Sequence, residues 1–149
     1  MLKDKDIGYI LHKVSMLAKN NFSNKLNTFG ITIVQFSVIK EIYYYQTNTD
    51  GALGLSPACI ADRLESDRPT ITGVIDRLES QGWVDKFKNP DDRRSVLIKV
   101  TDKAIGRLAE LEKMRYESIN NIINGFTEEE INTLRNYLFR IENNLKNVQ

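Results

Sequence analysis

Apolar positions in the middle of the chain recur every three to four residues in two consecutive segments. Ser56 and Pro57 have the chemistry of an N-cap and a first helical residue, so they predict a short helix that ends near Leu64. Asp67 is a good N-cap for a second helix, and Gly82 stops it. The apolar residues of this second helix form one narrow stripe: Ile71, Val74, Ile75 and Leu78. The spacing therefore predicts two short helices in tandem.

After Gly82 the period of the pattern changes from about 3.6 to about 2. Residues 83–88 and 95–100 are rich in branched and aromatic side chains, which predicts two strands joined as a hairpin. Residues 89–94 have turn chemistry and end in Arg93 and Arg94. An arginine at the tip of a narrow ribbon can enter the minor groove of DNA, where the potential is negative. Alternatively, the two arginines only pair in solvent with the acidic residues beside them.

The second helix carries small and polar residues on the side opposite its apolar stripe. These are Pro69, Gly73 and Asp76, flanked by Thr70, Thr72 and Arg77. A glycine inside a helix costs about 1 kcal/mol relative to alanine, so Gly73 suggests a backbone that approaches another surface closely, with a neutral surface glycine as the alternative. A carboxylate facing DNA repels phosphates. Asp76 must therefore either pair with a basic side chain or lie where a base donor can reach it.

Longer amphipathic helices flank this central part. The first runs from about residue 4 to 27, and Thr32 caps a second one; a loop over residues 48–55 then includes a possible short strand that completes the hairpin sheet. Thr101 or Asp102 caps a long helix, and Thr127 with Glu130 forms the capping box of the last. The last helix has an apolar seam at intervals of three and four: Ile131, Leu134, Leu138, Ile141, Leu145 and Val148. Packing within one chain could cover such a seam, but with an equally apolar first helix the pattern favours the two helices mating across a two-fold axis in a homodimer.

Composition narrows the class of protein without deciding it. The 149 residues include 21 basic and 20 acidic side chains and carry a net charge of +1, which argues against a protein that coats nucleic acid by charge alone. A single cysteine excludes a disulfide framework within the chain. No signal peptide and no run of about 18 apolar residues is present, so we expect a cytoplasmic protein away from membranes. No Gly-rich phosphate loop, metal cluster or nucleophile-base pair is evident either, so we expect neither an enzyme nor a metal or cofactor.

Several short motifs, all in register over residues 60–101, resemble the MarR family (multiple antibiotic resistance regulators) of bacterial transcription factors. They are Ile60-Ala61-Asp62-Arg63-Leu64, Arg68-Pro69-Thr70-Ile71-Thr72, Asp76-Arg77-Leu78-Glu79, Gly82-Trp83-Val84, Asp92-Arg93-Arg94-Ser95 and Val100-Thr101. The resemblance implies an α+β, mostly α, winged helix-turn-helix with flanking N- and C-terminal dimerisation helices. We expect one domain over residues 1–149, with the DNA-binding part at about 50–101 and dimerisation helices at about 4–27 and 102–149.

The resemblance also implies how such a protein meets DNA. A homodimer places its recognition helices in successive major grooves of a pseudo-palindromic operator and its wing arginines in the flanking minor grooves, with Asp92 orienting Arg94. The expected DNA-binding residues are Ser56, Arg68, Pro69, Thr70, Thr72, Gly73, Arg77, Asp92, Arg93 and Arg94. The chain departs from the family pattern at Glu65, often a glycine, at Ser66, usually apolar, and at Asn89, often an aspartate.

Regulation is read from single residues. His12, Tyr43 and Tyr44 lie on helices that line the effector cleft in the family, so a small aromatic acid or phenol could bind there; ordinary core or surface roles are the alternative. We expect Cys59 to be a small packing residue, with a redox-responsive regulator as the alternative. Together these features predict a sequence-specific DNA-binding regulator, a repressor relieved by a small aromatic ligand. A winged helix that binds only other proteins is the alternative from another class.

Overall fold

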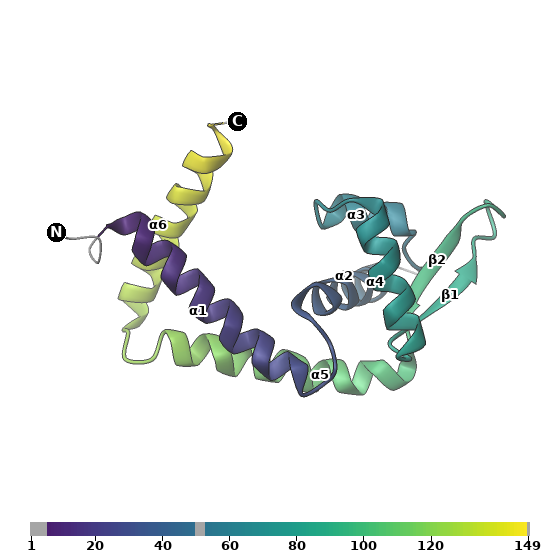
Figure 1. The fold of residues 1–149 in the computed structure, drawn as a ribbon, viewed down its shortest axis with the longest axis horizontal. Helices are drawn as coiled ribbons and strands as arrows, with labels where there is room; N and C mark the ends of the chain where they lie inside the picture. The colour runs from purple at the N-terminus through teal and green to yellow at the C-terminus, as the bar shows by residue number, and fades with distance from the viewer. Residues whose placement is uncertain (1–5, 50–52, 149) are drawn as a thin grey trace. The chain divides into compact units, whose positions relative to one another are not determined.

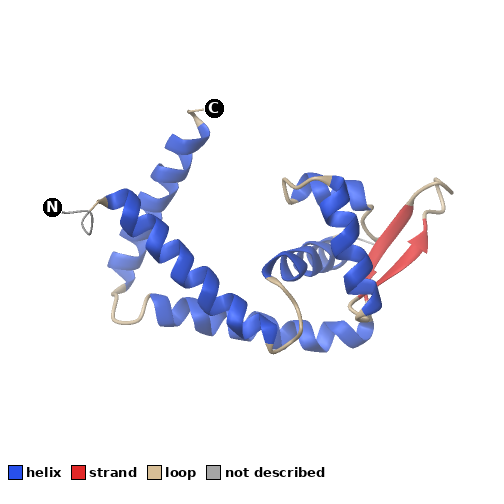
Figure 2. Cartoon of the chain, in the orientation of Figure 1, coloured by secondary structure: helices blue, strands red, loops and turns tan. Residues whose placement is uncertain are grey.

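The computed structural model describes residues 6–49 and 53–148 of the chain. They form six helices and a two-stranded antiparallel sheet (Figures 1 and 2). The elements are α1 (Ile7–Asn27), α2 (Ile33–Asn48), α3 (Pro57–Arg63), α4 (Arg68–Ser80), β1 (Val84–Lys88), β2 (Val96–Val100), α5 (Asp102–Ile122) and α6 (Glu128–Lys146). The expected mostly helical α+β class is confirmed. None of these helices has the length and apolarity that a membrane span requires.

The chain divides into two compact units, residues 1–114 and 115–149. The boundary falls within α5. The expected single domain over residues 1–149 stays a prediction. Residues 4 and 5 of the expected first helix, and Asp50 and Gly51 of the expected loop, lie outside the described residues.

Local capping chemistry begins the helices where the sequence predicts. The side chains of Thr32, Ser56 and Asp67 accept hydrogen bonds from backbone N–H groups in the first turns of α2, α3 and α4. Each cap satisfies a donor that would otherwise have no partner within its helix. Glu65, between α3 and α4, has a φ of 51°. This left-handed conformation favours glycine, which fits the glycine that the resemblance leads us to expect at this position.

The hairpin is the expected wing. Strands β1 and β2 pair antiparallel, with Val84 opposite Val100 and Lys88 opposite Val96. Leu55 adds a single bridge to Ile98, which is all that forms of the expected third strand in the described residues. Its N–H donates to the carbonyl of Ile98 over 3.1 Å, and the N–H of Ile98 donates back over 2.8 Å.

Trp83 belongs to the buried core of the first unit. It is buried, and the guanidinium carbon of Arg107 lies 4.5 Å from its ring centroid. The Trp83 carbonyl accepts from the backbone of Thr101 over 3.1 Å, and the Thr101 hydroxyl donates to the carbonyl of Gly82 over 2.8 Å. The end of α4, the start of β1 and the start of α5 are therefore joined at one point.

A polar network ties α2 and the α1–α2 connection to the same point. The amide of buried Gln35 donates to the Gln81 side chain over 3.4 Å, and Gln81 donates to the carbonyl of Gly30 over 3.1 Å. Arg107 donates to the carbonyl of Phe29 over 3.4 Å. Gln35 is the buried member of this network, and pairing of its amide helps to fix α2 against the end of α4.

The second unit has little core of its own. The capping box of Thr127 and Glu130 begins α6 as predicted, but no residue of α6 is buried. Most of the predicted seam is exposed, from Leu134 at 38% to Leu145 at 68%, and its last member, Val148, lies beyond the end of the helix. Helix α1 in the first unit is similar, with Ile7 70% and Leu17 55% exposed. Both helices present apolar faces that the single chain leaves in water.

Gly54 offers a test of how the wing is fixed. Its φ is +106°, and a Cβ built there would lie 2.6 Å from the carbonyl oxygen of Ile98. We expect Gly54→Ala to lower the free energy of unfolding by roughly 1–3 kcal/mol, because it strains the backbone and opens the Leu55–Ile98 bridge. Urea unfolding measures this change.

A matched alanine control exists in α5. Gly106 lies inside the helix, and an added Cβ meets nothing within 4 Å. Gly106→Ala should therefore raise the free energy of unfolding by up to about 1 kcal/mol. Equal and small effects at both glycines would contradict the close approach at Gly54.

Candidate nucleic-acid interface

One depression of about 940 Å³ joins three segments of the first unit: the start of α3, the outward side of α4 and the tip of the wing. Its lining is mostly polar or small, and the helical part of it comes from the turns of α4 nearest its N-terminus. The lining residues are Ser56, Pro57, Ala58, Arg68, Pro69, Thr72, Gly73, Asp76, Asn89, Asp92, Arg94, Ser95 and Val96. Seven of the ten expected DNA-binding residues therefore share one surface.

The other three, Thr70, Arg77 and Arg93, are exposed but do not line the depression. The helical period explains the first two. Thr70 and Arg77 are about two turns apart on one edge of the buried stripe of α4, whereas Thr72 lies on the other edge. The residues flanking the stripe thus point to two sides of the helix.

Thr70 has a structural role as well. Its hydroxyl donates to one carboxylate oxygen of Asp67 over 2.7 Å, and its N–H donates to the other over 2.9 Å. The hydrogen bonds from Thr70, the side-chain one first, lower the pKa of Asp67 below its ordinary value. With its proton committed to the cap, the Thr70 hydroxyl is left as an acceptor.

The wing tip is held by its own polar side chains. Asp92 accepts from the backbone N–H of Arg94 over 2.9 Å, so it shapes the turn through the main chain. Asn89 accepts from the N–H of Asp91 and donates to the Ser95 hydroxyl, both over 3.0 Å. Asparagine therefore closes this turn at a position where aspartate is frequent in the family.

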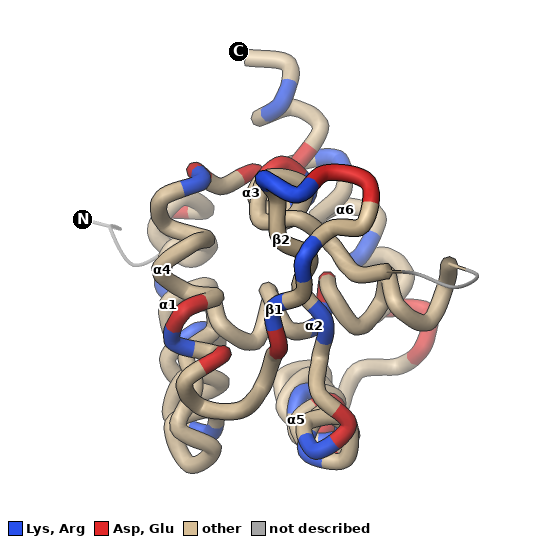
Figure 3. Tube along the Cα trace, turned by 90° about the vertical axis from the view of Figure 1, so that its right-hand side faces the viewer, with Lys and Arg blue, Asp and Glu red and all other residues tan. Residues whose placement is uncertain are grey.

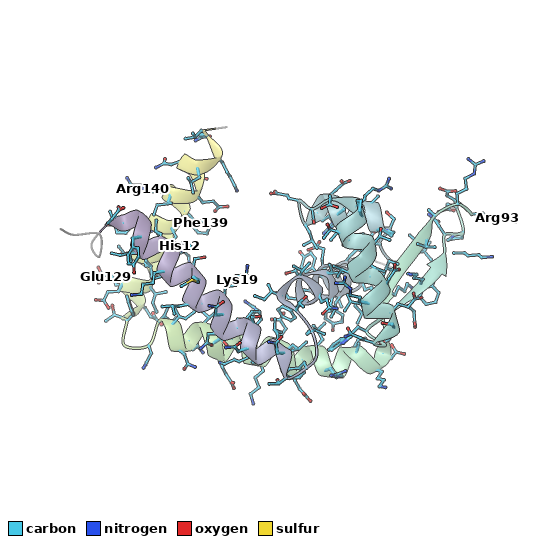
Figure 4. All side chains as sticks on the ribbon, in the orientation of Figure 1. His12, Lys19, Arg93, Glu129, Phe139 and Arg140 are labelled. Carbon is cyan, nitrogen blue, oxygen red and sulfur yellow. The ribbon has the colours of Figure 1, made fainter. Side chains whose placement is uncertain are left out.

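The guanidinium groups of both wing arginines are free to contact another molecule. Arg93 projects from the end of the hairpin (Figure 4), and Arg94 is exposed beside the depression. Neither guanidinium forms an ion pair or hydrogen bond with another residue in the described ranges 6–49 and 53–148. Pairing with Asp91 and Asp92, the alternative from the sequence, is not what the structure shows.

Asp76, by contrast, is paired. Lys86, from β1, donates to one oxygen of Asp76 over 2.6 Å and to Glu79 over 2.8 Å. These hydrogen bonds, to Asp76 first and then Glu79, raise the pKa of Lys86 above the ordinary value of 10.5. The resulting stabilisation is fully present below that value and is lost only as the pH rises through the raised pKa. The sequence pattern did not single out Lys86, although its strand position, two after buried Val84, is on the same face of the hairpin.

Charged residues of both signs are distributed along the chain in small groups. Figure 3 shows basic and acidic segments interspersed along the chain, in keeping with the net charge of +1. A surface of this kind attracts a polyanion locally, at exposed arginines, and not over a whole face.

The residues considered for regulation are spread over three helices. His12 is exposed on α1 (Figure 4), Tyr44 is exposed on α2, and Tyr43 is partly buried against the core. Cys59 on α3 is an exposed free thiol, so the expectation of a packing role is wrong. The buried face of α3 is supplied by its neighbours Ile60 and Ala61, and Cys59 lies just beyond that face. Within the described part of the chain, no three His, Cys, Asp or Glu side chains are placed to hold a metal ion.

Comparison with known proteins agrees with this geometry. The model of the MarR family matches residues 31–96, from the start of α2 into β2. The transcriptional regulator PecS of Dickeya dadantii is 28% identical over 137 residues, which cover 92% of this chain and 80% of PecS. A mutant MarR from E. coli in complex with operator DNA superposes with a TM-score of 0.74 at 26% identity, covering 91% of this chain and 92% of that one.

A further solved structure supports the fold alone. The S. aureus MepR–DNA complex gives a TM-score of 0.78 at 21% identity, covering 96% of this chain and 99% of that one. The order of elements, the matched segment and these similarities lead to one conclusion. Residues 31–96 carry the winged-helix domain of the MarR family, and over about nine-tenths of its length the chain is similar to transcriptional regulators of that family.

Proposed function

We propose that this chain is a homodimeric repressor that binds a pseudo-palindromic operator in the cytoplasm and releases it when a small aromatic ligand binds. The observation that carries the DNA-binding part is the depression in which Thr72 and Gly73 of α4 lie beside Arg94 of the wing. Its small, polar and cationic lining suits the edge of a duplex. A winged helix that binds only proteins would be expected to present apolar side chains there.

Each expected residue has a proposed task. Thr72, with Pro69 and Gly73, faces base edges in the major groove, and Arg94 enters the minor groove. The remaining residues are proposed to fix the register by contacting phosphates or shaping the loops: Ser56, Arg68, Thr70, Arg77, Asp92 and Arg93. Of these, Asp92 acts through the backbone N–H of Arg94.

The exposed apolar faces of α1 and α6 support the homodimer. Large apolar patches on a soluble chain mark interaction surfaces, and a two-fold axis lets the same patch cover itself. Two recognition helices related by that axis would meet half-sites about 10 bp apart. A dimer seated over two successive major grooves would exclude RNA polymerase from an overlapping promoter, which is why we propose repression.

The proposed effector site includes His12, Tyr43 and Tyr44. An aromatic acid or phenol would stack on the tyrosines. To release DNA, it must bind with different affinity to two conformations of the dimer that differ in the spacing of their recognition helices. Titrating phenolic acids into an operator complex tests this step. The exposure of Cys59 favours a second candidate, a redox-responsive repressor. In that case thiol oxidation, and no aromatic acid, would release the parent from DNA, while Cys59→Ser would stay bound.

A substitution at Gly73 should change stability and DNA binding in opposite directions. A Cβ at this position meets nothing within 4 Å, so packing does not require glycine. We expect Gly73→Ala to raise the free energy of unfolding by up to about 1 kcal/mol and yet to weaken operator binding, because the methyl group separates α4 from the groove. Gly106→Ala should bring the same stability without loss of affinity. A Gly73→Ala variant that binds the operator like the parent would show that the backbone does not approach DNA.

Substitutions of Arg94 and Thr72 should affect operator binding in different ways. Arg94→Ala removes a cation from the minor groove, so operator affinity should fall by roughly 1–3 kcal/mol and the salt slope by about one. Thr72→Val should instead change the ranking of operator variants with little effect on the slope. Mobility-shift titrations at several salt concentrations measure both. Parent-like binding by Arg94→Ala at every salt concentration would move the protein-binding alternative ahead.

Leu138 tests the dimer. It lies in the exposed seam of α6, and Leu138→Glu places a charge where we expect the partner chain. We expect this variant to sediment as a monomer and to bind operator DNA much more weakly. Asn136→Glu adds the same charge on the opposite side of the helix and should remain dimeric. A parent chain that sediments as a monomer at micromolar concentration would contradict the homodimer directly.

A further inference from the structure

The carboxylate of Asp76 lies among the residues proposed to face DNA. It lines the depression together with Thr72 and Gly73, and its side chain is 58% exposed. A free carboxylate at this place would repel the phosphates on both sides of the groove. Its presence therefore needs either a compensating cation or a favourable contact with a base.

Lys86 supplies the cation and leaves the carboxylate half free. It donates to Oδ1 of Asp76, and its side chain, 29% exposed, also reaches Glu79. Among residues 6–49 and 53–148, no hydrogen bond is made to Oδ2 of Asp76. The ammonium group thus fixes the direction of the carboxylate and offsets part of its charge, while Oδ2 of this depression-lining residue remains an unoccupied acceptor.

We propose that Asp76 reads a cytosine in each half-site by accepting a hydrogen bond from its N4 amino group, and that Lys86 is the residue that positions it. The inference rests on the proposed function, since it needs α4 in the major groove.

Base chemistry selects cytosine among the four bases. An ionised carboxylate can only accept hydrogen bonds, and in the major groove only cytosine N4 and adenine N6 donate them. The adenine amino group lies beside N7, an acceptor that repels a carboxylate. Guanine and thymine offer acceptors at the corresponding places, so they leave the Asp76 oxygen facing an acceptor.

The experiment selects DNA from a pool. The full-length parent is bound to double-stranded DNA with randomised half-sites, and the bound fraction is sequenced. We expect cytosine at one position in each half-site. In Asp76→Ala the preference for cytosine at this position should fall about five-fold. This variant should bind unrelated DNA at least as well as the parent, because it lacks a negative charge. Asp76→Asn should shift the same position towards adenine, whose N6 and N7 suit an amide.

Asp85→Asn is the matched control. It removes the same charge from the neighbouring position of β1, on the opposite face of the hairpin from Lys86. The cytosine preference should survive this change. Lys86→Met, which keeps an aliphatic stem, should lower both the preference and the overall affinity, and Lys86→Arg should restore both. Loss of structure alone would not act on one base position, and urea unfolding of each variant checks that the fold is retained.

The outcomes separate the two proposals. A parent that selects a sequence, with Asp76→Ala keeping the same preference or losing affinity equally for all sequences, would overturn the inference and leave the proposed function intact. A parent that selects no sequence from the pool would overturn both.

Discussion

The anchoring of Trp83 is the constraint on which the proposed DNA-binding surface, formed by α4 and the wing tip, depends. The indole is buried, lies against Arg107, and occupies the point where α4 ends and the wing begins. Thr101 bonds the backbone of Gly82 and Trp83, so the start of α5 is joined to the same point. Because the wing strands return to α5 there, the tip of the hairpin and the outward face of α4 are held over one depression. A junction of this kind holds the joined elements in one relative position, because a close-packed core leaves the side chains little room to move.

The proposed DNA-binding surface combines attraction with local repulsion. Arg94 is free beside the depression, whereas the acidic side chains nearby are occupied: Asp92 in the turn, and Asp76 with Lys86. Paired carboxylates cost little in encounter with a polyanion, and they restrict which DNA fits. With a net charge of only +1, the protein has little sequence-independent attraction to rely on, so discrimination has to come from the geometry of a few side chains.

Sequence reasoning succeeded where the determining interactions are local. The caps at Ser56, Asp67 and Thr127 and the change of period after Gly82 depend on neighbours in the chain, and the structure confirms them. It failed where the contacting residues are far apart in the chain, or where a shift of one position decides whether a side chain is buried. The partner of Asp76 lies on another element, and Cys59 sits one position outside the buried face of α3. The helical period divides Thr70 and Arg77 from Thr72, but which of these two sides of α4 faces the wing depends on where the hairpin lies, and the period does not contain that.

We propose that α4 and the wing tip engage one duplex together, in adjacent grooves. Site-directed DNA cleavage tests it most directly, with an iron chelate attached through Thr72→Cys or Arg94→Cys in a Cys59→Ser background. We expect the probe at position 72 to cleave within each half-site with the strand offset of a major groove. The probe at position 94 should cleave the flanks with the strand offset of a minor groove. Cleavage by both probes at the same base pairs, or by only one of them, would contradict it.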